Sequence, residues 1–208
     1  GLTMIDESSR NPLYTTTFGT GELIKHAVLS GKKTIYITLG GSATNDGGLG
    51  TLTALGYKMI KKDGTIARGV GEELSEIVRI DNSNAIDISG VKFIILSDVT
   101  NPLTGEKGAT KVFAKQKGAT PEMIEILENG MLNWQTVLTE YTKKDVKNIV
   151  GGGAAGGMGA SLCSVLNAEI KSGVDEILNI VDFSKELTDA DYVITGEGRI
   201  DEQSIDGK

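Results

Sequence analysis

The spacing of apolar residues predicts three strands with helical segments between them. Residues 34–39, Thr-Ile-Tyr-Ile-Thr-Leu, form a short β-branched run that is typical of a strand in a covered parallel sheet. Residues 91–97, Val-Lys-Phe-Ile-Ile-Leu-Ser, have the same character. Residues 192–195, Tyr-Val-Ile-Thr, predict a third strand near the end of the chain.

Helices are predicted where apolar positions recur at helical spacing. In residues 22–29 the apolar side chains share one helical face, and Gly31 follows the last turn. Residues 120–122, Thr-Pro-Glu, are typical of a helix start, and the helical pattern continues to about Tyr141. Trp134 lies on this helix and is expected to pack in the core. Shorter helices are expected over residues 48–55, 160–166 and 173–181.

The alternation of strands and helices predicts an α/β fold, with a mostly parallel sheet and helices on both faces. Residues 61–64, Lys-Lys-Asp-Gly, predict a hairpin turn. No secondary structure can be assigned to residues 66–90 from the sequence. Residues 1–208 are therefore interpreted as one unit that can divide into two lobes near residues 60–90.

Each predicted strand is followed by a polar or glycine-rich stretch, namely residues 40–48, 98–105 and 196–201. Ligands of open parallel sheets bind beyond the carboxyl ends of the strands. The sequence therefore predicts a binding site that is assembled from all three stretches.

The first stretch combines four glycines with polar side chains of four different types. Its residues are Gly40, Gly41, Ser42, Ala43, Thr44, Asn45, Asp46, Gly47 and Gly48. Backbone N–H groups in such a turn can bind a phosphate or a carboxylate. The alternative is that the polar residues cap the next helix while the glycines permit a tight turn.

The other two stretches supply charged groups. Glu197, Arg199 and Asp201 follow the third strand, and Asp98 follows the second. Phosphoryl transfer uses a carboxylate to accept the hydroxyl proton or to hold Mg²⁺, and a cation to bind the transferred group. The alternative for Arg199 is a surface ion pair with a neighbouring carboxylate.

A separate glycine cluster at residues 151–156 matches the pattern G-x-G-x-x-G, and Glu169 follows at a distance suitable for a ribose contact. An NAD(P)-dependent oxidoreductase is therefore an alternative function. Close packing of a helix explains the small residues equally well. No Walker A pattern is present in the sequence.

Composition and charge narrow the class of protein. The net charge is −7 and no block of Lys or Arg occurs, so nucleic acid and anionic membranes are not expected as principal partners. The sequence shows no signal pattern or apolar run of membrane-spanning length, which predicts a cytoplasmic location. Cys163 is interpreted as a buried small hydrophobe. The lone His26 makes a metal site or a histidine-based triad improbable.

The sequence resembles the bacterial glycerate kinase family through eight segments in order. They are residues 10–13 (Arg-Asn-Pro-Leu), 15–17 (Thr-Thr-Thr), 19–24 (Gly-Thr-Gly-Glu-Leu-Ile), 40–48, 97–103 (Ser-Asp-Val-Thr-Asn-Pro-Leu), 116–122 (Gln-Lys-Gly-Ala-Thr-Pro-Glu), 151–159 and 196–201. The resemblance implies phosphorylation of D-glycerate by ATP with Mg²⁺, on the 2-hydroxyl, in a cleft between two domains.

Members of that family begin earlier and continue further, so the chain corresponds to their central portion. Whether this portion is active alone stays open, and a non-catalytic binding or assembly domain is the alternative. A homodimer is also left open.

The chemistry of the reaction assigns candidate roles to the predicted site residues. Asp46 is the first choice for the general base and Asp201 the second. Arg199 is expected to bind the substrate carboxylate or the transferred phosphoryl group, and Asp98 or Glu197 to hold Mg²⁺. The residues expected to bind phosphate or glycerate are Gly40, Gly41, Ser42, Thr44, Asn45 and Glu197.

Overall fold

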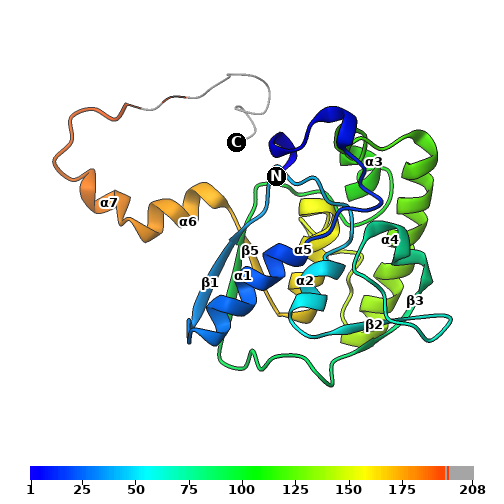
Figure 1. Cartoon of the computed structure of the whole chain (residues 1–208). Coiled ribbons are helices and arrows are strands. Elements are labelled where there is room, and N and C mark those ends of the chain that lie inside the picture. Colours follow the sequence, from blue (N-terminus) through cyan, green and yellow to red (C-terminus); the bar gives the residue numbers. More distant parts are fainter. Residues whose placement is uncertain (195, 197–208) are drawn as a thin grey trace.

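A three-stranded parallel sheet forms one side of the protein (Figure 1). The structure is a computed structural model that describes residues 1–194 and 196. Strands β1 (Thr34–Thr38), β4 (Lys92–Leu96) and β5 (Glu169–Lys171) lie in the order β1-β4-β5, and Thr34 pairs with Lys92 at the start of the ladder. This sheet and the helices between its strands confirm the predicted α/β class.

A second, antiparallel sheet pairs β2 (Lys58–Lys61) with β3 (Ile77–Asp81). The predicted turn follows β2: the N–H of Gly64 donates to the carbonyl of Lys61 at 2.9 Å, and Gly64 has a φ of 82°. Between the two strands the chain forms the 3₁₀ helix η3 (Gly71–Glu76). Residues 66–90 show neither helical nor strand periodicity in the sequence, because tertiary contacts hold much of this segment.

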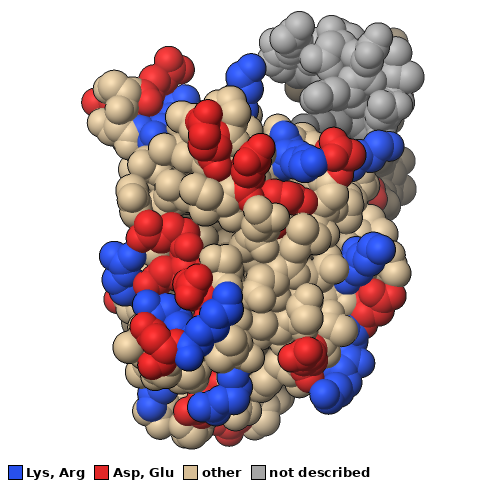
Figure 2. Space-filling model, turned by 90° about the vertical axis from the view of Figure 1, so that its right-hand side faces the viewer, with Lys and Arg blue, Asp and Glu red and all other residues tan. Residues whose placement is uncertain are grey.

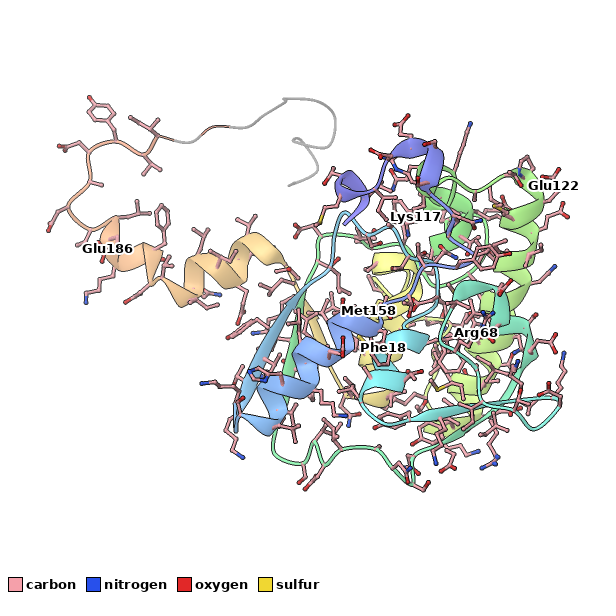
Figure 3. All side chains as sticks on the ribbon, viewed as in Figure 1. Phe18, Arg68, Lys117, Glu122, Met158 and Glu186 are labelled. Atoms are coloured by element: carbon pink, nitrogen blue, oxygen red, sulfur yellow. The ribbon has the colours of Figure 1, made fainter. Side chains whose placement is uncertain are left out.

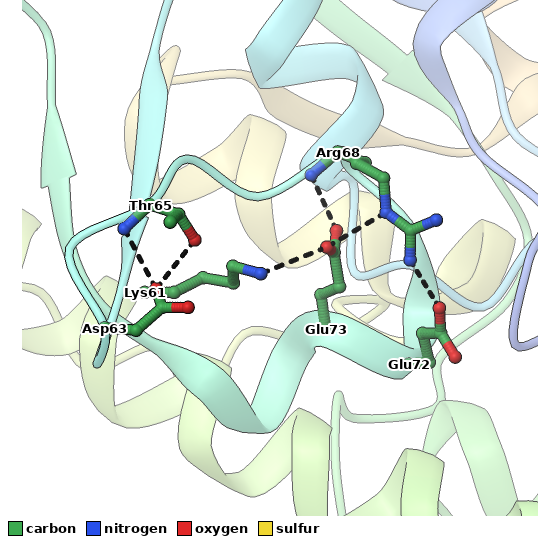
Figure 4. A network of polar contacts seen from close by, with 6 residues as sticks. All are labelled: Lys61, Asp63, Thr65, Arg68, Glu72 and Glu73. Carbon is green, nitrogen blue, oxygen red and sulfur yellow. Dashed lines mark hydrogen bonds and ion pairs between the residues drawn. The ribbon is translucent and has the colours of Figure 1, made fainter.

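Glu73 fixes the connection between β2 and β3 (Figure 4). Its buried carboxylate accepts hydrogen bonds from the backbone N–H of Arg68 at 2.6 Å and from the Arg68 guanidinium at 3.1 Å. The ammonium of Lys61 lies 3.6 Å from the same carboxylate. A buried charge needs such partners, since it would otherwise lose its hydration without compensation.

The predicted helices are present, and two short helices, α3 (Ala109–Phe113) and α7 (Phe183–Glu186), were not predicted. Thr120 caps the longest helix, accepting a hydrogen bond from the N–H of Met123 at 3.3 Å. The helices are α1 (Phe18–Leu29), α2 (Leu49–Ala54), α3 (Ala109–Phe113), α4 (Pro121–Thr142), α5 (Ala154–Val165), α6 (Gly173–Ile180) and α7 (Phe183–Glu186), with 3₁₀ turns η1 (Leu2–Met4), η2 (Glu7–Ser9) and η4 (Lys115–Lys117).

The two sheets share one hydrophobic core. Trp134 of α4 is fully buried, as predicted, and packs in the same cluster as Phe93 of β4 and Met59 of β2. The Trp134 indole N–H donates to the carbonyl of Gly47 at 3.0 Å. The core therefore contacts the glycine-rich turn after β1 through Trp134.

The predicted strand at residues 192–195 is not confirmed, because described residues 192–194 lie outside any strand. The third strand is β5, in which Ile170 is the sole apolar residue. On β1 only alternate residues are buried, and Tyr36 on the outer face is 43% exposed. Helix α6 reaches this second face at its edge, where the Tyr36 hydroxyl donates to Glu176 at 3.4 Å.

Charges of both signs are mixed on the face shown in Figure 2. No large area of that face carries Lys and Arg alone. Within residues 1–194, no helix combines the length and the apolar character needed to cross a membrane.

Helix α5 begins with three successive residues in the left-handed region. Their φ values are 51° at Ala155, 67° at Gly156 and 91° at Gly157. A Cβ atom at Gly156 would lie 2.1 Å from the carbonyl oxygen of Thr44. The carbonyl of Gly156 accepts a hydrogen bond from the N–H of Gly47 at 2.9 Å. Glycine is required here both for the backbone angle and for the close approach to the turn after β1.

Replacing Gly156 by Ala should lower the free energy of unfolding by roughly 3 kcal/mol, because a left-handed alanine costs about 1 kcal/mol and the overlap with Thr44 adds to it. Urea denaturation measures the change. Gly64→Ala is the matched control, with φ of 82° but open space around the added Cβ. Its expected loss is about 1 kcal/mol, and equal losses for the two variants would contradict the packing argument.

Candidate functional site

Two cavities lie side by side beyond the carboxyl end of β1, with volumes of about 440 and 420 Å³. Both are lined by residues 39–42 and by Ala155, so the turn after β1 forms a wall between them. The first cavity is also lined by Tyr14, Thr15, Thr16, Thr20, Thr38 and Met158, and the second by Asp98, Phe113, Gln116 and Lys117. The cavities adjoin two of the three predicted stretches, residues 40–48 and 98–105, while residues 197–201 of the third lie outside the described residues.

The wall between the cavities is held by backbone hydrogen bonds on both sides. The N–H of Leu39 donates to Leu96 of β4 at 3.1 Å, and the N–H of Leu2 donates to the carbonyl of Gly41 at 2.7 Å. The Thr15 hydroxyl donates to the carbonyl of Ala43 at 3.0 Å. Gly40, Gly41 and Ser42 therefore lie where the sequence placed them, and Thr44 lines the first cavity only.

Asp46 is completely buried and lines neither cavity. Its carboxylate accepts hydrogen bonds from the N–H and hydroxyl of Thr17, at 2.7 and 2.8 Å, and from the N–H groups of Gly48 and Gly50, at 3.1 and 3.2 Å. Burial raises the pKa of Asp46, against the opposing effect of these hydrogen bonds. This geometry contradicts the predicted role of general base and supports the capping alternative.

Asn45 is also buried away from both cavities. Its amide nitrogen donates to the hydroxyl of Thr110 at 3.0 Å, which joins the turn after β1 to α3. The predicted contact between Asn45 and a phosphate or glycerate does not fit this position. The side chain instead ties the wall to the helix beside the second cavity.

Asp46→Asn should lower the free energy of unfolding by about 3 kcal/mol. An amide has one acceptor oxygen for four buried donors, and each unsatisfied buried donor costs about 1–3 kcal/mol. The midpoint of urea denaturation measures the loss. The control is Asp6→Asn, since Asp6 is exposed and its side chain caps nothing. An Asp46→Asn protein with unchanged stability but no turnover would restore the catalytic interpretation.

Asp98 lies at the rim of the second cavity, at the carboxyl end of β4. One oxygen of its exposed carboxylate accepts a hydrogen bond from the N–H of Gly173 at 3.1 Å. Mg²⁺ is commonly bound by one or two carboxylates together with substrate phosphates. Asp98 fits one such ligand, although no group of three or more potential metal ligands occurs in the part of the chain that the structure describes.

The remaining charged candidates, Glu197, Arg199 and Asp201, lie outside the described residues. Their predicted roles as metal ligand, phosphoryl-binding cation and general base therefore stay predictions.

Lys117 is a site residue that the sequence reasoning missed. It lies on η4 beside α3 (Figure 3), is 2% exposed, and lines the second cavity. Its ammonium donates to the carbonyl of Thr44 at 2.7 Å. Burial lowers the pKa of Lys117 to about 8, although the carboxylate of Asp46 acts in the opposite direction. The sequence signal for this position is Gly118, which directly follows Lys117 and ends the 3₁₀ turn with a φ of 90°.

Lys117→Met should raise the free energy of unfolding at pH 7 by about 1 kcal/mol, because removing a buried charge outweighs the hydrogen bond to Thr44. A lysine with a lowered pKa in the folded state binds more protons when unfolded. The stability of the unsubstituted protein should therefore rise as pH increases from about 8 toward the ordinary lysine pKa. Urea denaturation at several pH values checks this, and the rise should be absent from the variant.

The glycines of residues 151–153 pack against neighbouring backbone. A Cβ at Gly151 would lie 2.8 Å from the carbonyl oxygen of Val99, and one at Gly153 would lie 2.3 Å from that of Pro102. Residues 145–150 form no strand. The dinucleotide interpretation is therefore wrong at this position, because its fingerprint needs a strand that leads into an open glycine turn.

Cys163 and His26 lie apart from the candidate site. Cys163 on α5 is partly buried, and burial raises the pKa of its thiol to about 11, so the thiol stays protonated. His26 is exposed on α1. Neither residue belongs to the cavities.

The fold and the paired cavities define an α/β protein with two adjoining cavities beyond the carboxyl end of its parallel sheet. Comparison with known proteins identifies it further. The profile of the Glycerate kinase family matches residues 1–208, and the chain belongs to this family.

Several similar proteins are named as glycerate kinases. The chain is 44% identical to a glycerate kinase of Halalkalibacterium halodurans over 209 residues and 44% identical to glycerate 2-kinase of Escherichia coli K12 over 215 residues. A crystal structure assigned to glycerate kinase 2 of Salmonella typhimurium LT2 matches with a TM-score of 0.91 and 44% identity, over 99% of this chain. In each case the chain covers 55% of the relative, or about half its length.

Proposed function

We propose that the protein containing this chain phosphorylates D-glycerate with ATP and Mg²⁺ in the cytoplasm, at the 2-hydroxyl. The observation that carries the proposal is the match of the entire chain, at 44% identity, to proteins named glycerate kinase. The name glycerate 2-kinase, given to the Escherichia coli relative, supports the choice of hydroxyl.

The two cavities are suited to the two substrates of such a reaction. Several residues with hydroxyl groups, among them Tyr14, Thr15, Thr20 and Thr38, line the first cavity, and they can hydrogen-bond a small hydroxy acid. The second cavity carries the charged side chains Asp98 and Lys117. We therefore assign glycerate to the first cavity and the phosphates of ATP to the second.

The chain's own residues position the reacting groups. Residues 39–42 line both cavities, so the two substrates would bind on neighbouring sides of one segment, and phosphoryl transfer depends on bringing them into alignment. When bound, Mg²⁺ neutralises charge on the phosphates, and Asp98 and Glu197 are its proposed ligands. Since Asp46 is buried, Asp201 becomes the proposed acceptor of the hydroxyl proton, and Arg199 the cation that binds the transferred group.

The full-length protein should consume ATP only when D-glycerate and Mg²⁺ are both present. Phosphorus NMR of the product distinguishes 2-phosphoglycerate, the expected product, from 3-phosphoglycerate. Formation of the 3-isomer would contradict the proposed position. Failure to phosphorylate glycerate at all would contradict the proposed activity.

Asp201→Asn should lower kcat by about 10²–10⁴-fold, which is the usual contribution of a general base. Asp98→Asn should raise the Mg²⁺ concentration needed for half-maximal rate, because the amide is a weaker ligand. Steady-state kinetics over a range of Mg²⁺ concentrations measures both effects. Asp189→Asn, at an exposed position outside the cavities, should leave both parameters unchanged. Normal turnover of the Asp201 variant would exclude it as the base.

A further inference from the structure

The ammonium of Lys117 is placed between the wall of the site and the second cavity. Lys117 is 2% exposed, whereas the neighbouring Lys115 on the same 3₁₀ turn is exposed. Among the described residues, the Lys117 ammonium donates one hydrogen bond, to the carbonyl of Thr44 at 2.7 Å. Because an ammonium has three donors, two remain for a ligand in the cavity that the side chain lines.

Burial of this lysine opposes folding. The side chain is 2% exposed and makes one hydrogen bond, so burial removes hydration of the charged form and lowers the pKa of Lys117. A methionine would fill similar space without that loss. A bound anion would supply the missing partner, since charged groups withdrawn from water are stabilised by pairing.

We propose that Lys117 binds a phosphate group of the nucleotide in the second cavity. The inference rests on the proposed function, and it assigns a role to a lysine of the segment 116–122, to which the sequence alone assigned none. Two observations favour a phosphate over the carboxylate of glycerate. Asp98, suited to a phosphate-bound Mg²⁺, lines the same cavity as Lys117, and the hydroxyl-rich lining suited to glycerate belongs to the other cavity.

The backbone around Lys117 holds its ammonium in place. The hydrogen bond to Thr44 ties it to the turn that forms the wall between the cavities. The 3₁₀ turn η4, which carries Lys117, is in turn held by the N-terminal segment, where the Arg10 guanidinium donates to the carbonyl of Gln116 at 3.4 Å. The Lys117 side chain is therefore already ordered before a ligand binds, which reduces the conformational entropy lost on binding.

The test compares Lys117→Met with Lys115→Met in the full-length protein. Steady-state kinetics should show that Lys117→Met raises KM for ATP at least tenfold or lowers kcat by a similar factor. Its KM for D-glycerate should stay within twofold. Lys115→Met should match the unsubstituted protein. Calorimetry should show at least tenfold weaker binding of ATP and of inorganic tripolyphosphate by the Lys117 variant, with an unchanged or higher urea midpoint.

A second measurement needs no variant. Tripolyphosphate should slow the acylation of Lys117 by an amine-reactive reagent, measured by mass spectrometry, while the acylation of Lys115 in the same sample stays unchanged. Equal rates with and without tripolyphosphate would overturn the proposal. A change in KM for glycerate alone would also overturn it, since Lys117 would then bind the carboxylate.

These outcomes separate the inference from the proposed function. A protein that phosphorylates glycerate normally after Lys117→Met keeps its proposed function and excludes the role of Lys117. A protein that does not phosphorylate glycerate but binds tripolyphosphate through Lys117 loses the proposed function and keeps the binding residue.

Discussion

The site depends on the buried carboxylate of Asp46. Its four hydrogen bonds join Thr17, at the start of α1, to Gly48 and Gly50, at the start of α2. These two helices border the turn that separates the cavities, so one side chain links the start of α1 to the turn and to α2, which lie about 30 residues further along the chain. The carboxylate compensates its lost hydration by using donors that would otherwise be unpaired at the helix starts. The position of the wall between the cavities is thus set by hydrogen bonds to a buried side chain.

Small residues allow the segments to approach closely enough for this arrangement. Gly156 contacts the backbone of Thr44, and Gly151 and Gly153 contact residues 99–102 after β4. Two glycine clusters that look alike in the sequence therefore have different tasks: residues 40–42 face the cavities, whereas residues 151–153 form packed interfaces. Polar groups are then brought to the cavities by the neighbouring elements, with Asp98 from the end of β4 and Lys117 from η4.

Much of the fold could be predicted from the sequence, because helical periods, caps and β-branched runs are local signals. The start of α4 at Thr120 and the strands β1 and β4 are examples. Strand β5 was missed because it has three residues and is defined by pairing with β4. The position of the site followed from strand ends, but the roles of Asp46 and Lys117 did not. Burial decides both roles, and it depends on contacts between segments that the sequence does not place together.

The wall of residues 39–42 also determines how the site can be resized. Gly40 has an ordinary backbone conformation, and no atom lies within 4 Å of a Cβ added there. A larger side chain at Gly40 would consequently occupy cavity space without forcing the backbone apart, unlike one at Gly156. Residues 39–42 line both cavities, so the direction in which the new side chain points determines which of the two cavities loses volume. Position 40 is therefore a place where the size of the cavities can be changed without disturbing the core.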